Sequence, residues 1–134
     1  MQLNKTLLDS LTEQAKASPR LRMSYDLRNS ASDHSQRVLN ALEPKTIIPI
    51  HRHPLSSETF IVLRGKLKET FFNEKGEITD TFICEADGES FGCQIPIGQW
   101  HTAKSLESGT IILECKDGTY EPTKTEDILE LDNQ

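Results

Sequence analysis

The feature that most constrains this chain is the spacing of its histidines. Three of the four histidines lie in two short segments, at His51 and His53 and then at His101. Side chains two positions apart on a β-strand point to the same face of the sheet, so His51 and His53 would present two imidazoles side by side. This spacing predicts two nitrogen donors directed at one point.

Two turns next to these segments supply further donors. Residues 54–57 have turn composition, and Glu58 opens a run with strand chemistry at 58–63. Residues 96–99 form a second turn, with Pro and Gly in favoured positions, and His101 follows two residues later. The sequence therefore predicts three imidazole nitrogens and one carboxylate around a common point.

Such a donor set suits one divalent transition metal ion. Imidazole binds first-row ions well, and one carboxylate offsets half of the charge. An octahedral ion would keep two positions for water or substrate, which is typical of a catalytic site. We therefore expect a Zn, Fe, Ni or Mn cofactor held by His51, His53, Glu58 and His101. The alternatives are a metal that only stabilises the fold, or a chain that has lost its metal.

Two patterns resemble the motifs of the cupin superfamily. The first, HxH(x4)E(x6)G, is filled by His51, His53, Glu58 and Gly65. The second, PxG(x2)H, is filled by Pro96, Gly98 and His101. The chain departs from the cupin pattern at the motif edges, with Lys45 where cupins have glycine and Ser105 where they have asparagine. Neither of these positions is a metal-ligand position.

A longer resemblance covers most of the chain. The segments SPRLR at 18–22, QRVLNALEP at 36–44 and ECKDGTYEP at 114–122 are similar to the WbuC family of cupin-fold metalloproteins. This resemblance implies a cupin double-stranded β-helix, that is, a jelly-roll barrel. It also implies an association with bacterial surface-polysaccharide gene clusters, but no settled reaction.

The strand pattern is consistent with an all-β domain. Turns recur every 8–12 residues or so between β-rich runs, which is typical of a sandwich or small barrel. The predicted strands are 38–42, 46–53, 58–63, 66–72, 78–84, 91–95, 101–105 and 110–116. A short helix at 36–42 is the competing interpretation of the first of these. Pro49 indicates an edge or a bulge, because proline cannot donate to a ladder.

The two ends of the chain complete a single domain over residues 1–134. Apolar residues recur at helical spacing from Leu3 to Ala15, and Pro19 ends this helix. We expect an N-terminal helix at 1–18 packed outside a barrel at 36–118. The C-terminal extension, 119–134, is expected as a short strand or helix on the outside, or as a partly ordered tail.

Several side chains are candidates for binding a substrate. Arg20, Arg22 and Arg37 lie in a short basic stretch suited to anionic or sugar groups, with a solvated basic patch as the alternative. Arg64 shares strand parity with Glu58, which predicts that it faces the site. Trp100 is a candidate platform for a sugar ring, or else a packing residue. His34 matches no ligand spacing and is expected at the surface.

Composition excludes some partners. A net charge of −6 and a pI near 5.2 disfavour nucleic acid, which requires a basic surface. The chain has no secretion signal or membrane span, so a cytoplasmic protein is expected. Its three cysteines are expected to be reduced, buried hydrophobic residues. A homodimer is expected, because small cupins commonly pair through sheet edges.

Three functions are compatible with this donor set. The first is metal-assisted isomerase, epimerase, lyase or hydrolase chemistry on a small sugar-derived or hydroxy/carboxy molecule. The second is a metal-dependent module that binds such a ligand without turnover. The third is an Fe(II)-dependent dioxygenase. The sequence does not separate them, because all three use the same ligands.

Overall fold

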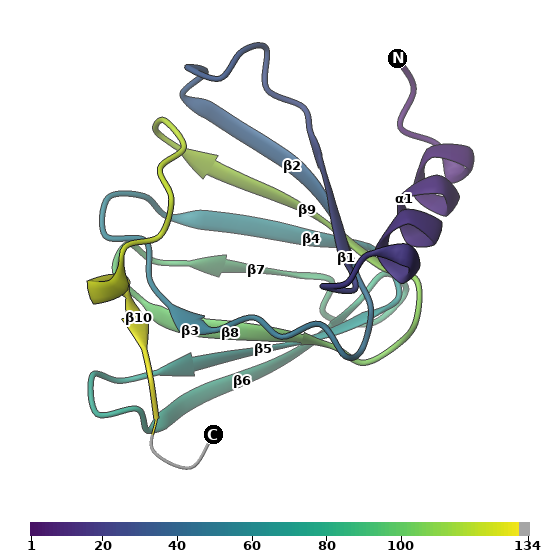
Figure 1. Ribbon diagram of the computed structural model, residues 1–134. Helices are drawn as coiled ribbons and strands as arrows, with labels where there is room; N and C mark the ends of the chain where they lie inside the picture. Colours follow the sequence, from purple (N-terminus) through teal and green to yellow (C-terminus); the bar gives the residue numbers. More distant parts are fainter. Residues whose placement is uncertain (132–134) are drawn as a thin grey trace.

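Two five-stranded antiparallel sheets lie face to face in the computed structural model, which describes residues 1–131 (Figure 1). The first sheet has the order β1 (Arg22–Asp26), β2 (Ser35–Leu42), β9 (Thr110–Asp117), β4 (Glu58–Arg64), β7 (Gly92–Ile95). The second has the order β10 (Ile128–Leu129), β3 (Ile50–His51), β8 (Trp100–Ser105), β5 (Lys66–Phe72), β6 (Ile78–Glu85). Strands from opposite ends of the sequence are neighbours in both sheets, as in a jelly roll.

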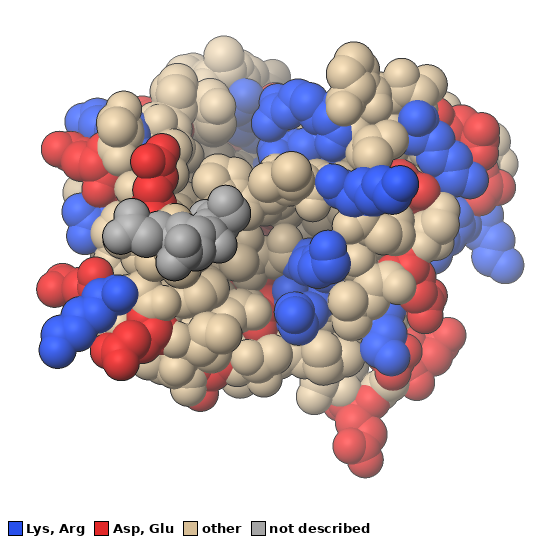
Figure 2. All heavy atoms as spheres, turned by 60° about the horizontal axis from the view of Figure 1, so that its bottom comes forward, with Lys and Arg blue, Asp and Glu red and all other residues tan. Residues whose placement is uncertain are grey.

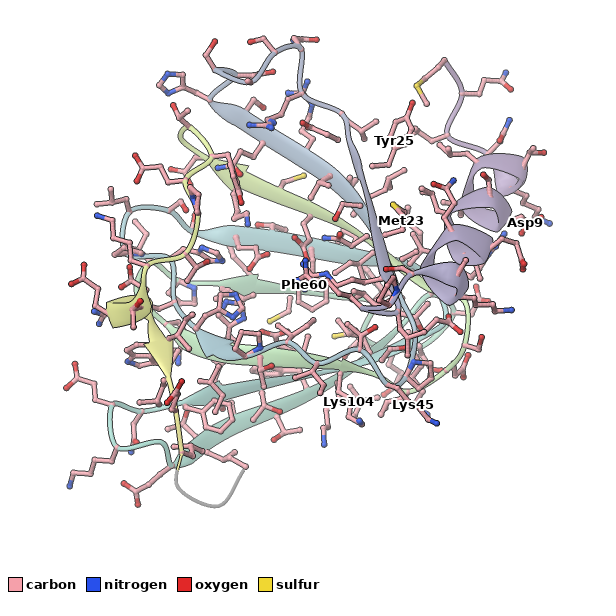
Figure 3. All side chains as sticks on the ribbon, in the orientation of Figure 1. Asp9, Met23, Tyr25, Lys45, Phe60 and Lys104 are labelled. Atoms are coloured by element: carbon pink, nitrogen blue, oxygen red, sulfur yellow. The ribbon has the colours of Figure 1, made fainter. Side chains whose placement is uncertain are left out.

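The core between the sheets follows from alternation along each strand. On β4, Phe60 and Val62 are buried whereas Ile61 and Leu63 are exposed, because successive side chains point to opposite faces. Phe60 lies in the interior between the two sheets (Figure 3), where it packs in a cluster with Leu42, Val62, Leu67, Phe71, Cys84, Ile95 and Ile112. Glu58 is on the same face of β4, so a carboxylate enters the interior with these apolar groups.

The N-terminal helix α1 (Lys5–Ala17) packs outside the first sheet, as predicted. The Asn4 side chain accepts a hydrogen bond from the Leu7 amide and caps the first turn. The apolar face of the helix is buried on the outer side of β2 and β9, in a cluster with Leu11, Ala15, Leu39, Ala41 and Ile111. Met23 and Tyr25 extend from β1 toward this helix (Figure 3).

The strand boundaries differ from the predicted ones in two places. The predicted strand at 46–53 pairs only over β3, and the carbonyl of Ile48 accepts from the Thr102 hydroxyl at 2.6 Å instead of joining a ladder. Strand β1 was not predicted, so the first sheet begins at Arg22 and not at residue 36. The competing helix at 36–42 is wrong, because β2 pairs with both β1 and β9.

The C-terminal segment crosses the open end of the barrel. Residues 118–127, here called the strap, run from the end of β9 to the short helix η1 (Thr125–Asp127) and lead into β10, which pairs with β3 (Figure 1). Arg52 holds the strap: its Nε donates to Asp127 Oδ1 at 2.9 Å and its amide to the Asp127 carbonyl at 3.0 Å. The extension therefore contains a short helix and a short strand, and residues 132–134 lie outside the described part.

Candidate metal centre

Three histidines from the second sheet converge inside the barrel. His51 on β3 and His101 on β8 are register partners, and their ring centroids are 4.3 Å apart. His53 follows β3, with its ring centroid 5.0 Å from that of His51. One nitrogen from each of the three rings lies within 4.8 Å of the others, so the group can hold a metal ion.

Glu58 brings a carboxylate next to two of these histidines from the opposite sheet. Its Oε2 lies 3.6 Å from Nε2 of His101 and 3.9 Å from Nε2 of His53. The side chain is only 5% exposed. The four predicted ligands are therefore adjacent in space, although they come from three strands and a loop.

Glycines fix the turn that precedes His101 and the turn that follows β4. Gly98 has a φ of +77°, and its amide donates to the His53 carbonyl at 2.9 Å. This bond ties the second motif directly to the first. Gly65 has a φ of +82°, and a Cβ there would overlap the Thr110 hydroxyl, so glycine is required where β4 turns into β5.

Hydrogen bonds set the orientation of two imidazoles. Nδ1 of His51 lies 2.8 Å from the Pro49 carbonyl, to which it donates, leaving Nε2 as the free donor atom. Nδ1 of His101 lies 2.6 Å from Oε1 of Glu69, a carboxylate on β5 that is 1% exposed. Metal-ligating histidines typically make such a bond through their second nitrogen.

Glu69 is a residue that the sequence reasoning missed. It lies between Leu67 and Phe71 on the inward face of a predicted strand. A charged residue among apolar ones on that face was the signal that could have marked it as functional. Burial raises the pKa of Glu69 to about 9.

The site is suited to a cation. Burial lowers the pKa of His51 to about 4, of His53 to about 3 and of His101 to about 4, so all three are neutral donors at pH 7. Burial also raises the pKa of Glu58 well above its usual range. Within residues 1–131, Oε2 of Glu58 and Nε2 of His101 are buried without a hydrogen-bond partner. Such orphaned atoms are costly unless a ligand or ion satisfies them.

A cavity of about 740 Å³ surrounds this group. Its wall includes inward-facing residues of β2 and β9, such as Gln36, Asn40, Glu114 and Lys116. The strap forms another part, including Tyr120. A volume of this order accommodates a small molecule.

The predicted substrate residues are divided between this cavity and other parts of the molecule. Arg20 and Arg22 line the cavity. The Arg37 guanidinium donates to the Leu27 and Ser35 carbonyls, and so orders the loop between β1 and β2. His34 is exposed, as expected, at the rim.

Arg64 and Trp100 do not face the cavity. The β4–β9 register shifts between Val62 and Arg64, which breaks the predicted parity, and Arg64 Nη1 instead donates to Asp9 of α1 at 2.7 Å. Trp100 precedes His101 on β8 and so points to the opposite face, where it packs with Ile50 and Phe72. The Arg52 guanidinium lies 4.6 Å from the centroid of its ring.

Several solved structures share this fold. The capsular polysaccharide assembling protein CapF from Staphylococcus aureus matches with a TM-score of 0.66 and 21% identity over 81% of this chain and 30% of that chain. Oxalate oxidase in complex with glycolate matches with a TM-score of 0.63 and 14% identity, over 80% of this chain and 56% of that one. KdgF from Halomonas sp. matches with a TM-score of 0.61 and 12% identity, over 77% of this chain and 84% of that one.

These neighbours are cupins, and the chain has the cupin fold. It spans less than a third of the length of CapF. Residues 3–84 match the model of a family described as a domain of unknown function (DUF6016), and the chain belongs to that family. No curated protein sequence matches it.

On the face in Figure 2, basic and acidic side chains are interspersed, with large areas of other residues between them. Among the described helices, none has the length and apolar character needed to span a membrane.

Proposed function

We propose that this chain is a metal-dependent cupin that binds one divalent transition metal ion through His51, His53, Glu58 and His101. The observation that carries the proposal is the convergence of three neutral imidazoles with a buried carboxylate whose Oε2 has no partner among residues 1–131. A cation at this point would satisfy both orphaned atoms and favour the ionised form of Glu58.

The bound ion would supply Lewis-acid chemistry, that is, polarisation of a carbonyl or activation of water. The chain itself orients the donors. The Pro49 carbonyl and the Glu69 carboxylate each fix one imidazole through Nδ1. The strap and the inner faces of the sheets enclose a space of small-molecule size next to them.

The ligand that we propose is a small sugar-derived or hydroxy/carboxy molecule, in a pathway of surface polysaccharide biosynthesis. The resemblance to the WbuC family and the similarity to a capsular polysaccharide assembling protein support the sugar. The glycolate complex of oxalate oxidase shows a cupin fold together with a small hydroxy acid. We favour non-redox isomerase, epimerase or lyase chemistry; membership of the WbuC family and a cytoplasmic location remain predictions.

A ligand screen on metal-loaded protein tests this function. Sugar acids, nucleotide sugars and simple hydroxy acids are compared by thermal shift on the wild type, on Glu58→Ala and on the control Glu74→Gln, in the exposed turn after β5. A ligand at 100 times its Kd should stabilise the wild type and the control by about 2.7 kcal/mol, and Glu58→Ala by much less.

The outcome of the screen also separates the alternative functions. A shift that survives in Glu58→Ala would contradict the role of the metal. Binding without turnover would indicate a ligand-binding module. Oxygen consumption by Fe(II)-loaded protein would indicate a dioxygenase instead.

A further inference from the structure

The six arginines of this chain fall into two groups. Four have their guanidinium groups engaged by protein acceptors: Arg28 by Asp26, Arg37 by backbone carbonyls and Asp33, Arg52 by Asp127, and Arg64 by Asp9. The guanidinium groups of Arg20 and Arg22 make no hydrogen bond or ion pair within residues 1–131. Both line the cavity together with the three histidines; Arg52 lines it as well, but its guanidinium is engaged by Asp127.

The backbone between these arginines is held in an uncommon conformation. Leu21 has a φ of +55° and is the one non-glycine residue with positive φ in the described part of the chain. Its carbonyl accepts from the Glu43 amide at 3.0 Å and from the Thr46 hydroxyl, and its amide donates to the Ser18 carbonyl at 3.0 Å. Strained positions that the surrounding structure maintains are concentrated at functional sites.

The two charges are also poorly compensated. Burial lowers the pKa of Arg22, and the nearby positive charge of Arg20 lowers it further. Glu114, on the cavity wall, and Tyr120 of the strap act in the opposite direction but form no ion pair with Arg22 among the described residues. A half-buried guanidinium beside a second one is stabilised by an anion, for which its planar donors are suited.

We propose that Arg20 and Arg22 form an anion-binding subsite of the cavity, which takes a carboxylate or phosphate group of the ligand. The subsite lies at the β1 edge of the first sheet, whereas the histidines come from β3, β8 and the loop after β3 in the second sheet. The ligand is therefore bifunctional, with an oxyanion at one end and an oxygen donor for the metal centre at the other. This last point rests on the proposed function, whereas the anion site itself does not need the metal.

Titration of metal-free protein with an anion tests the subsite. Inorganic phosphate and acetate are added separately, and the arginine side-chain Nε–Hε signals are followed by NMR at constant ionic strength. We expect saturable shifts of Arg20 and Arg22 with at least one anion, and none for Arg28 or Arg37, which are already engaged. The anion that binds more tightly identifies the subsite as a phosphate or a carboxylate site.

Matched variants test whether Arg20 and Arg22 bind the anion. Arg22→Gln and Arg20→Gln should each weaken anion binding by about tenfold or more, because a hydrogen-bonded charge pair is lost. Lys75→Gln removes the same charge from the exposed β5–β6 turn, which does not line the cavity, and should leave the affinity unchanged. Arg20 is exposed, so its variant keeps the test valid if Arg22→Gln does not fold.

The subsite is rejected if neither anion gives saturable shifts, or if both arginine variants bind as tightly as the wild type. Metal binding is measured separately on the same samples. Metal binding without anion binding rejects only the subsite, and anion binding without metal binding rejects only the proposed metal function.

Discussion

Glu69 and His101 form the most enclosed polar contact at the centre. The imidazole is 4% exposed and the carboxylate 1%, and they meet at 2.6 Å. Without a metal, burial raises the pKa of Glu69 to about 9, so its carboxyl is neutral at pH 7. A cation at Nε2 of His101 would require the tautomer with its proton on Nδ1 and would favour the ionised form of Glu69, which accepts that proton. Glu69, which is not itself a predicted ligand, thus controls how well Nε2 of His101 can donate to the metal ion.

The variant Glu69→Gln should weaken metal binding by about 10–100-fold, because the amide still accepts from Nδ1 but carries no charge. Competition titration with zinc measures this affinity. Glu74→Gln, in the exposed turn after β5, is the control and should bind as the wild type does. Equal affinity in Glu69→Gln would show that the contact only packs the core.

The three cysteines differ in environment, although the sequence analysis treated them alike. Cys84 is buried, Cys93 is partly buried and Cys115 is exposed, so the expectation of three buried residues is wrong for Cys115. Burial raises the pKa of the Cys93 thiol to about 12. Only the thiolate reacts with an alkylating agent.

Alkylation by iodoacetamide should therefore modify Cys115 before Cys93. Because the thiolate fraction of Cys93 rises tenfold per pH unit below its pKa, its rate should rise about tenfold per unit from pH 7 to 10. Peptide mass spectrometry over time measures both rates. A rate for Cys93 that is flat above pH 8.5 would contradict the raised pKa.

The strap is the element whose role was least visible in the sequence. Its attachment depends on Arg52, which lies between the two first-motif histidines, pairs with the 4%-exposed Asp127 and stacks over Trp100. Trp100 does not line the cavity itself, but its ring packs against Arg52, which does.

Breaking this attachment with Arg52→Gln should lower the free energy of unfolding by about 1–3 kcal/mol, since Asp127 stays buried without its partner. Trp100 is the chain's single tryptophan, so its fluorescence reports the same change directly. Urea unfolding followed by fluorescence measures both, with Lys124→Gln as an exposed control on the strap. An unchanged midpoint would mean that the strap is held in another way.

Elements with a clear periodicity could be predicted from the sequence, whereas local irregularities could not. The helix before Pro19 and the hairpin of β5 and β6 were found from apolar spacing and turn residues. Strand β1 was missed although Met23 and Tyr25 alternate with polar residues; its apolar side packs toward α1, whereas Arg22 on its other side lines the cavity. The register shift before Arg64 has no sequence signature that we can identify.

The same alternation rule explains one success and one failure at the site. It placed His51 and His53 on a common face, and the structure brings them together with Glu58 and His101. The rule was not applied to Trp100. Neighbouring side chains on a strand point to opposite faces, so Trp100 points away from the face that carries His101. Glu69 could not be assigned as the partner of His101 because the contact depends on the pairing of β5 with β8.

At the scale of the whole molecule, the open edge of the first sheet is available for a second copy. Among the strands of residues 1–131, β7 pairs only with β4, and Ile61, Leu63 and Phe91 leave apolar surface beside it. Sheet edges and apolar patches of this kind are commonly covered by association.

We therefore still predict a homodimer, with about twice the 15.1 kDa mass of the chain at micromolar concentration. Light scattering after size exclusion measures this mass. Phe91→Lys should shift the mass toward that of the monomer, whereas Ile47→Lys, at a more exposed position outside β4 and β7, should not. A monomeric wild type would refute the prediction.

The central claim is that one metal ion lies where the two sheets bring their donors together. Its most direct measurement is elemental analysis of protein purified without a histidine tag, for the wild type, His53→Ala, His101→Ala and the surface control His34→Ala. We predict about one transition metal ion per chain in the wild type and in His34→Ala, and a large loss in the other two, because each lacks a ligand. A wild type that contains no metal and binds none of Zn, Ni, Mn or Fe(II) on titration would contradict this account, as would full occupancy in His101→Ala.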